Sequence, residues 1–297
     1  MNTEKNKESS KKSRQQNCQQ RRQQSRQQNR RRAMVILFVC SVIILTVIAI
    51  AGKYFWEDAI KTDFSRRNLP PCLRYPFGTD WMGRNMFLRT ICGLSLSIRI
   101  GCLTAAISAG IAFFMGIAAA MGKWADAVVS TVIDTIMGIP HMLLLILISF
   151  AAGRGLSGVV IGISLTHWTS LARLLRGEAL QLKEAPYMKI SRKLGTKRVR
   201  AAVRHMTPHL LPQLLAGAVL LFPHAILHEA SVTFLGFGLP PEQPAIGIIL
   251  SESMNYLAMG RWWLSLFPGL ALVLAVLLFH QIGNQISRLL DPDSNGY

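Results

Sequence analysis

A basic segment from Lys183 to Pro212 constrains the fold of this chain most, because it lies between two strongly apolar stretches. From Arg173 to Arg204 the chain carries ten lysine or arginine residues and only two acids, Glu178 and Glu184. Each arginine or lysine near the midplane of a bilayer costs about 2.5–3.5 kcal/mol on insertion scales. The segment must therefore lie in water on one side of a membrane, held by flanking helices that cross it.

The composition points to a protein that crosses the membrane several times. Hydrophobic residues make up 51% of the 297 positions and charged residues only 16%, and the mean hydropathy is +0.31. Half of the formal net charge of +18 lies in the first 32 residues, which hold eleven Lys or Arg against two acids. Such a segment cannot bury enough apolar surface to fold, so residues 1–32 are predicted to be a disordered basic tail. A tail of this kind either lies against anionic lipid headgroups or binds nucleic acid; we favour membrane lipid and expect no nucleic-acid partner.

An all-α membrane protein with six transmembrane helices is predicted from the apolar stretches. A run of about 20 apolar residues forms about 30 Å of helix, which is enough for one crossing. The predicted spans are residues 33–52, 94–121, 127–152, 156–175, 210–235 and 262–282. The third span is expected to bend at Pro140. Because an even number of spans places both termini on one side, the basic tail assigns both termini, and the basic segment, to the cytoplasm.

The remaining stretches complete the predicted organisation. Residues 53–92 form an extracytoplasmic segment, and a short helix over 248–257 precedes the sixth span. Five of the spans make up a core over residues 93–285, which includes a cytoplasmic loop at 177–209. Residues 286–297 form a cytoplasmic C-terminal tail.

The cytoplasmic loop predicts a short helix that ends sharply. Over residues 185–194, Tyr187, Ile190 and Leu194 fall on one helical stripe, and basic residues occupy much of the rest of the surface. Gly195 stands where a C′ glycine ends a helix. An amphipathic basic helix can lie on the membrane surface or dock on a soluble partner, and we favour docking.

A second helical segment is predicted to follow in the same loop. It covers residues 198–206 and is expected to end before Pro208, because a proline cannot donate a backbone hydrogen bond within a helix. The loop as a whole therefore reads as a helix–turn–helix.

The order of four motifs resembles the dipeptide, oligopeptide and nickel permease family of ABC importers. Tyr-Met-Lys-Ile-Ser-Arg-Lys-Leu-Gly at 187–195, followed by Arg-His-Met-Thr-Pro at 204–208, resembles the cytoplasmic "EAA" loop of such permeases. Phe-Gly-Thr-Asp-Trp-Met-Gly-Arg at 77–84 and Leu-Ala-Arg-Leu-Leu-Arg-Gly-Glu at 171–178 resemble two further family segments. The fourth is Glu-Ala-Ser-Val-Thr-Phe-Leu-Gly-Phe-Gly-Leu-Pro at 229–240.

The resemblance implies a type I ABC importer permease fold and a set of partners. They are a second permease subunit in a heterodimer, two ATPase subunits that bind ATP and Mg²⁺, and an extracytoplasmic substrate-binding protein, all at a bacterial or archaeal inner membrane. The chain contains no Gly-x-x-x-x-Gly-Lys-Ser/Thr, so we expect a transport subunit with no bound cofactor and no ATP site of its own, rather than an enzyme. The first motif resembles that of the second of the two permeases in such systems.

The same resemblance assigns the contact with the ATPase to the cytoplasmic loop. The residues it implies for this coupling are Tyr187, Lys189, Ile190, Ser191, Leu194, Gly195 and Pro208. The sequence departs from the family motif, because Lys189, Ile190 and Ser191 replace Glu-Ala-Ala and Thr207 replaces the leucine before proline. The acid that would pair with the ATPase is therefore missing, whereas the glycine that ends the helix is kept.

Ionisable residues inside apolar spans are the candidates for the translocation pathway. They are Asp134, His141, His167, His224, His228 and Glu229. His224 and His228 lie at i and i+4, so both imidazoles can bind one Ni²⁺, Co²⁺ or Zn²⁺ ion transiently. Asp134 and His141 are seven residues apart and are expected on one face of the third span. For each histidine alone, a hydrogen bond between helices is the competing interpretation.

Two hypotheses about the cargo follow. The histidines favour nickel or cobalt, or a metal–chelator complex, and the alternative is a dipeptide or oligopeptide. Outside the membrane, Asp80 and Arg84 are candidates for a gate or a contact with the binding protein, or for an ion pair that stabilises the loop.

Overall fold

The computed structural model describes residues 34–290, and their regular structure is helical. In this part of the chain the β pairing consists of two isolated bridges, Cys72 with Tyr75 and Thr79 with Asn85. The all-α fold class is therefore confirmed. The predicted tail at 1–32 and the last seven residues of the chain lie outside the described residues.

The helices follow one another with short connections. In chain order they are an N-terminal helix Met34–Tyr54, α2 Trp56–Ile60, a 3₁₀ turn Phe64–Arg66, α3 Met86–Met121, α4 Lys123–Gly138, α5 His141–Ala151, α6 Gly155–Glu184, α7 Pro186–Lys193, α8 Arg198–Ala201, a π-helical turn Ala202–Met206, α9 Thr207–Phe234, α10 Ile246–Leu257 and α11 Trp263–Leu290. Among the described residues five helices are long and apolar enough to cross a membrane, and the bent pair α4–α5 brings the number to six. This agrees with the six predicted spans.

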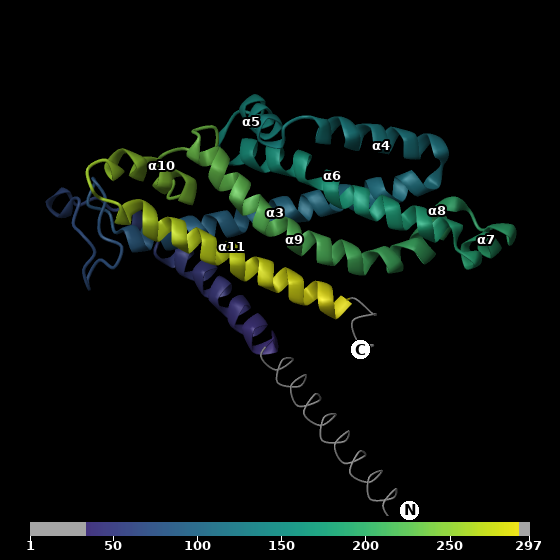
Figure 1. The fold of residues 1–297 in the computed structure, drawn as a ribbon, viewed down its shortest axis with the longest axis horizontal. Helices are drawn as coiled ribbons and strands as arrows, with labels where there is room; N and C mark the ends of the chain where they lie inside the picture. The colour runs from purple at the N-terminus through teal and green to yellow at the C-terminus, as the bar shows by residue number, and fades with distance from the viewer. Residues whose placement is uncertain (1–33, 291–297) are drawn as a thin grey trace, which may run out of the picture.

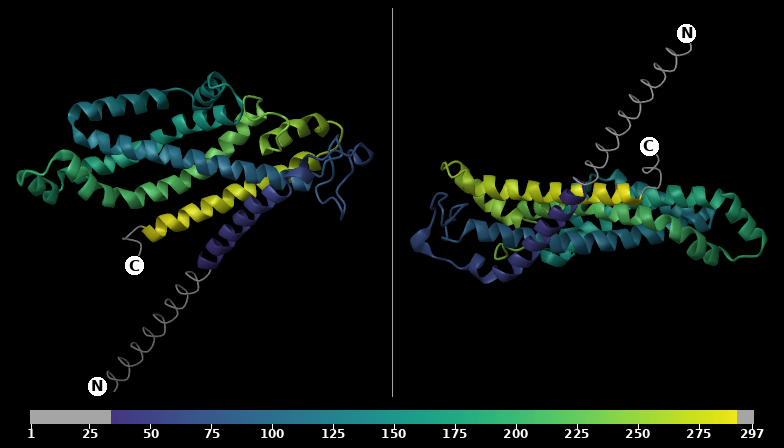
Figure 2. Two further views of the ribbon diagram at one scale, coloured as in Figure 1. Left: turned by 180° about the vertical axis from the view of Figure 1, so that it is seen from behind. Right: turned by 90° about the horizontal axis from the view of Figure 1, so that it is seen from below.

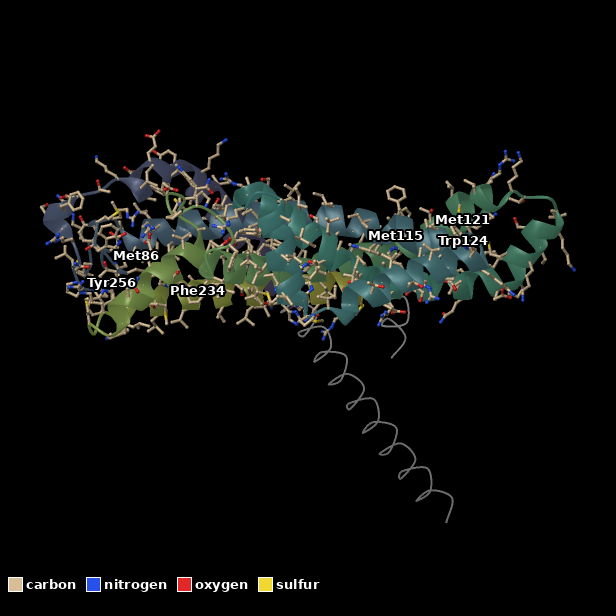
Figure 3. All side chains as sticks on the ribbon, turned by 90° about the horizontal axis from the view of Figure 1, so that it is seen from above. Met86, Met115, Met121, Trp124, Phe234 and Tyr256 are labelled. Carbon is tan, nitrogen blue, oxygen red and sulfur yellow. The ribbon has the colours of Figure 1, made fainter. Side chains whose placement is uncertain are left out.

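The long helices form an elongated bundle with two different ends (Figure 1). Helices α3, α6, α9 and α11 run along its length, with α7 and α8 at one end and α10 at the other. We call these the α7 end and the α10 end; Figure 3 marks them by Met121 and Trp124, towards the α7 end, and by Met86 and Tyr256, at the α10 end. The buried core lies along α3, α6 and α9, whose side chains make up most of one large apolar cluster.

The N-terminal helix lies at the margin of the bundle and diverges from α11 along its length (Figure 2). It is attached to α3 where the Ser95 hydroxyl donates to the Ala49 carbonyl at 2.9 Å. Only 11% of its apolar stretch is buried. Most of its surface is therefore left for lipid or for another subunit.

The third predicted span is broken into two helices that meet at 97°. The sequence placed the bend at Pro140, and the break lies at Ile139 and Pro140. Ile139 is extended, with ψ of 137°, because the ring of a following proline clashes with the α conformation. The expectation that Asp134 and His141 share one helix face is consequently wrong, since the two residues lie on different helices.

Glycines allow α5 to lie directly on α6. The turn at 153–155 has three consecutive residues with positive φ, and it folds the two helices back on each other. A Cβ atom on Gly158 would lie 2.5 Å from the Ser149 carbonyl oxygen, and one on Gly162 would lie 3.2 Å from that of Leu145. Small residues four apart are the usual means by which membrane helices approach closely.

Several helix ends lie beyond the sequence-based boundaries. Helix α3 begins at Met86 instead of residue 94, α6 continues to Glu184 instead of 175, and α11 continues to Leu290, into the predicted C-terminal tail. A polar or charged residue ends an apolar pattern without ending the helix when its side chain is paired or reaches water. Arg89, near the start of α3, is paired in this way.

The second segment of the basic loop does not end before Pro208. It is continuous with α9, so that one helix runs from Val199 to Phe234. The π-helical turn Ala202–Met206 lies just before the proline. A wider turn leaves room for the proline ring, which would otherwise clash with the carbonyl one turn earlier.

We predict that Gly158→Ala destabilises the protein relative to Gly110→Ala. Both glycines are helical, so the gain in helix propensity cancels in the comparison. The new methyl group at 158 meets the Ser149 backbone, whereas nothing lies within 4 Å of a Cβ at Gly110. Overpacking of this kind costs about 1–3 kcal/mol. The Tm of the two purified variants in detergent checks this, and equal Tm values would contradict the proposed contact.

Candidate functional site

A cavity of about 640 Å³ lies beside the break between α4 and α5. Its wall comes from the break itself, from α6 and from α9. The lining residues are Ile136, Met137, Gly138, Ile139, Pro140, His141, Thr166, His167, Thr169, Ser170, Leu221, His224 and His228. The broken span therefore opens a partly polar pocket that is open on one side, where Met137, Gly138 and Pro140 are exposed; irregular backbone at membrane depth commonly lines such a space.

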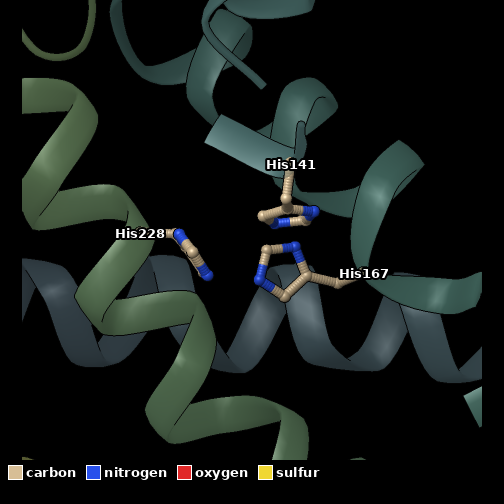
Figure 4. Close-up of side chains that lie close together, drawn as sticks. All are labelled: His141, His167 and His228. Carbon is tan, nitrogen blue, oxygen red and sulfur yellow. The ribbon is translucent and has the colours of Figure 1, made fainter. Parts of the chain in front are cut away.

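Three histidines from three helices converge at this cavity (Figure 4). His141 is the first residue of α5, His167 belongs to α6 and His228 to α9. Their ring centroids are 4.6–4.9 Å apart in every pair, and one ring nitrogen from each lies within 4.8 Å of the others. We call these residues the histidine cluster. All three were pathway candidates from the sequence, but their proximity was not predicted, because it requires the tertiary fold.

Of the two metal ligands suggested by the sequence, His224 and His228, the structure places only His228 in the histidine cluster. His224 lines the same cavity as His228, as two residues one helical turn apart would. The three donor atoms that come together are nevertheless those of the histidine cluster, to which His224 does not belong. His228 thus joins two residues that are distant in sequence.

Glu229 faces away from the cavity although it follows His228. Its side chain is fully buried. One carboxylate oxygen accepts from the Ser97 hydroxyl on α3 at 2.6 Å, and the other accepts from the Thr233 hydroxyl at 3.2 Å. Glu229 therefore joins α9 to α3, and it is not among the residues that line the cavity.

Asp134 lies on the outer surface of α4. Its carboxylate accepts from Arg173 on α6 at 2.6 Å, and both side chains are at least half exposed. It is not a lining residue of the cavity. An exposed ion pair of this kind contributes little to stability, and Asp134 takes no part in the histidine cluster.

Helix α7 and the residue that follows it carry a partly exposed apolar stripe. Tyr187, Ile190 and Leu194 are 40%, 58% and 81% exposed, whereas Met188 is only 1% exposed. The Met188 side chain packs among residues of α3, α8 and the π-helical turn, including Met206. We call these three exposed residues the α7 stripe. Met188 fixes the helix to the core, and the Tyr187 ring lies 6.3 and 6.1 Å from the rings of His205 and His209, so Ile190 and Leu194 are the members most available to a partner.

The predicted end of this helix is confirmed at Gly195. Its φ is +83°, a conformation that glycine adopts without strain. The Thr196 N–H donates to the Ser191 carbonyl at 3.1 Å, which is the 6→1 bond of a Schellman motif. On the exposed side Lys189 pairs with Glu184 at 3.0 Å.

A buried charge network occupies the α10 end. Asp80 Oδ2 accepts from Arg84 Nε at 2.6 Å and from Arg89 Nη1 at 2.7 Å. Glu252 Oε2 on α10 accepts from Arg89 at 2.9 Å and from Arg84 at 3.3 Å. Two arginines and two acids balance in charge, and together they tie the segment before α3 to α10. The ion-pair interpretation of Asp80 and Arg84 is borne out by these contacts, while a gating role stays a prediction.

Sequence reasoning missed two members of this network, Arg89 and Glu252. The sequence does indicate that each residue is paired, because each is a charged residue within an otherwise apolar helix and such residues require a partner. The identity of the partner was not readable, since 163 residues separate the two.

A helical bundle with several apolar spans, a cavity at a broken span and a short helix presented at one end fits a multi-pass membrane protein. Residues 111–295 match the family described as "Binding-protein-dependent transport system inner membrane component", and the chain belongs to this family. It is thus a permease subunit of an ABC importer, a protein of the inner membrane.

Several curated proteins are similar to this chain. A putative peptide transport system permease protein of Brucella suis biovar 1 is 37% identical over 231 residues, covering 78% of each chain. The dipeptide transport system permease protein DppC of Bacillus subtilis is 28% identical over 294 residues, covering 98% of this chain and 91% of that protein.

Among solved structures, a chain of the inward-facing MetNI methionine ABC transporter has a TM-score of 0.57 at 17% identity. The match covers 69% of this chain and 98% of that chain. At this identity the likeness concerns the fold alone, and it agrees with the predicted type I permease architecture.

We predict that Asp80→Ala destabilises the protein far more than Asp63→Ala. Removing Asp80 leaves two buried arginines with one carboxylate between them, and breaking a buried ion pair costs about 3–5 kcal/mol. Asp63 pairs with Arg66 at 3.1 Å, with both side chains about 40% exposed or more, and accepts from the Ser65 N–H at the start of the 3₁₀ turn, so its loss should cost at most about 0.5–2 kcal/mol. The Tm and membrane abundance of both variants test this. Similar values would mean that the network does not hold the α10 end together.

Proposed function

We propose that this chain is one of two permease subunits in an ATP-driven importer that carries short peptides. The observation that supports its role in the assembly most directly is the α7 stripe. An exposed apolar surface on a basic helix, fixed from behind by Met188, suits docking into a cleft of a soluble ATPase. ATP and Mg²⁺ are bound by the ATPase subunits and not by this chain.

Movement of the ATPase would reach the cavity through α6 and α9. Helix α7 follows α6 after one residue, and Met188 packs against the π-helical turn that leads into α9. The same two helices carry His167 and His228 at the cavity. A displacement of α7 as a rigid body therefore shifts two walls of the cavity together.

The other partners follow from the surfaces that remain. The N-terminal helix and the outer face of α11 are apolar and exposed, which suits lipid and a second permease subunit in a heterodimer. With both termini in the cytoplasm, as the basic tail indicates, the α10 end faces outward. A substrate-binding protein would deliver cargo there.

Peptide cargo is supported by the names of the relatives, which are peptide and dipeptide permeases. A second candidate, nickel or cobalt as the ion or a metal–chelator complex, is favoured by one specific observation. This observation is the histidine cluster in the cavity wall. The two candidates differ in what the cavity must recognise.

Reconstituted uptake separates the two cargoes. The complete complex in proteoliposomes, with its binding protein outside and ATP inside, is expected to accumulate labelled dipeptides or tripeptides. The control omits ATP. Accumulation of nickel with no accumulation of any peptide would overturn the peptide proposal and establish the second candidate.

We further predict that Gly195→Val uncouples the ATPase whereas Gly260→Val does not. Both glycines have positive φ, near +80°, and a Cβ atom at either position would meet no neighbouring group within 4 Å. A β-branched residue at 195 destabilises the end of α7 and displaces the α7 stripe. Gly260 lies in the turn after α10, at the other end of the bundle.

The measurements are copurification of the ATPase subunits and ATP hydrolysis in the assembled complex. We expect Gly195→Val to lose association or stimulation by several-fold and Gly260→Val to retain both. Normal association and stimulation in Gly195→Val would refute the role of α7.

A further inference from the structure

We propose that His141, His167 and His228 form a binding site for a divalent transition-metal ion in the permease cavity. The first argument is convergence. The three rings come from α5, α6 and α9, and one donor atom from each lies within 4.8 Å of the others. Figure 4 shows the rings turned toward a common point between the helices.

Two of the three side chains have a buried nitrogen without a hydrogen-bond partner. These atoms are Nε2 of His141 and Nε2 of His167. Leaving a buried polar atom unsatisfied costs about 1–3 kcal/mol, and native proteins rarely do so without a reason. A metal ion between the rings would satisfy both atoms at once.

The partner of the other ring nitrogen sets the tautomer of His167. Its Nδ1 lies 3.1 Å from both the Ile163 carbonyl oxygen and the Thr166 hydroxyl, and that hydroxyl donates its own proton to the Gly162 carbonyl at 2.9 Å. A carbonyl oxygen can only accept, so Nδ1 carries the proton and Nε2 keeps its lone pair. Histidines that bind metals are commonly oriented by such a bond to a backbone carbonyl.

His228 is oriented in a similar way by a side chain of α5. Its Nδ1 lies 3.0 Å from the Met142 sulfur, which is a weak acceptor and has no proton to donate. The tautomer that makes this hydrogen bond carries its proton on Nδ1 and keeps a lone pair on Nε2. Both rings thus keep the nitrogen that a metal ion needs.

The spacing fits a metal ion after small rotations of the rings. Metal–nitrogen bonds of about 2.0–2.1 Å place tetrahedral donors about 3.4 Å apart. The present separations are up to 4.8 Å, so binding requires the side chains to turn towards one another. Three ligands leave at least one position open, and an open site suits a passing ion better than a closed one.

The donor set selects the class of ion. Three neutral imidazoles without a carboxylate suit Ni²⁺, Co²⁺, Cu²⁺ or Zn²⁺ and do not suit Mg²⁺ or Ca²⁺. The neighbouring acids do not change this, because Glu229 faces Ser97 and Asp134 faces Arg173. His224 lines the same cavity and offers a further imidazole along it.

The ion can enter as a hydrated ion or within a small chelator. A cavity of about 640 Å³ has room for a chelator of the size of a short peptide, and the open positions on the metal would be filled by its donor atoms. The histidine cluster can bind a metal ion whether or not the protein transports that ion. That the ion is cargo rests on the proposed import function.

Direct binding to the purified complex tests the site. The assembly is stripped with a chelator, dialysed against Ni²⁺ or Co²⁺, and analysed for bound metal by mass spectrometry. We expect one ion at the cluster, and at least tenfold weaker binding in His141→Gln, His167→Gln and His228→Gln. His280→Gln, an exposed histidine on α11, is the matched control and should bind as the wild type does.

A second variant separates a ligand from a packing residue. His228→Cys replaces the imidazole by a thiolate, which also binds these ions, so binding should persist and the Co²⁺ absorption should acquire a sulfur charge-transfer band. A purely structural histidine would not be rescued in this way. A wild-type complex that stays empty, or Gln variants that bind like the control, overturns the proposal.

Uptake assays test the metal site and the import function separately. ATP-driven uptake of peptide by a complex that binds no ion would refute the metal site and leave the importer intact. Metal binding that the Gln variants abolish, in a complex with no ATP-driven uptake of any cargo, would support the site and refute the import function. Supplying nickel alone or as a histidine chelate then identifies the form that is transported.

Discussion

The direct contact between α5 and α6 determines the geometry on which the functional interior depends. Gly158 and Gly162 remove the side chains that would hold the two helices apart, and the extended Ile139 before Pro140 turns α5 away from α4 by 97°. His141, the first residue of α5, consequently lies over α6 and contacts His167. A straight third span would have kept His141 on the line of α4 and left no cavity at this point.

The buried charged groups in the described part of the chain are paired or hydrogen-bonded, whereas six buried polar side-chain atoms are not, and two of these six lie together at the cavity. Asp80, Arg84, Arg89 and Glu252 neutralise one another at the α10 end. Arg176 on α6 donates two hydrogen bonds, at 2.6 and 3.0 Å, to a carboxylate at the start of α4. By contrast, two imidazole nitrogens at the cavity have no partner. In a medium of low dielectric, unpaired polar atoms such as these two nitrogens cost free energy. A bound ligand would remove that cost, and this is the reason for assigning one to the histidine cluster.

The two ends of the bundle are held together by different means. At the α10 end, the charge network ties a segment with little regular structure to α10. At the α7 end, the stripe is partly exposed, and the buried Met188 and the Tyr187 ring beside His205 and His209 hold its helix to the bundle. The relatives point to peptide as cargo and the histidine cluster points to metal. A metal ion carried in a chelator of peptide size satisfies both observations.

The sequence by itself determined the helical class, the number of spans, the position of the break and the end of α7 at Gly195. These are local properties, because hydrophobic length, a proline and a C′ glycine act within a few residues of themselves. Helix ends were less predictable, as at Met86 and Leu290, since pairing lets a helix continue beyond its apolar run. Only the tertiary structure decided which ionisable residues meet. It brought together His141, His167 and His228, turned Glu229 to Ser97, and paired Arg89 with Glu252, because contacts between distant residues depend on how whole helices cross.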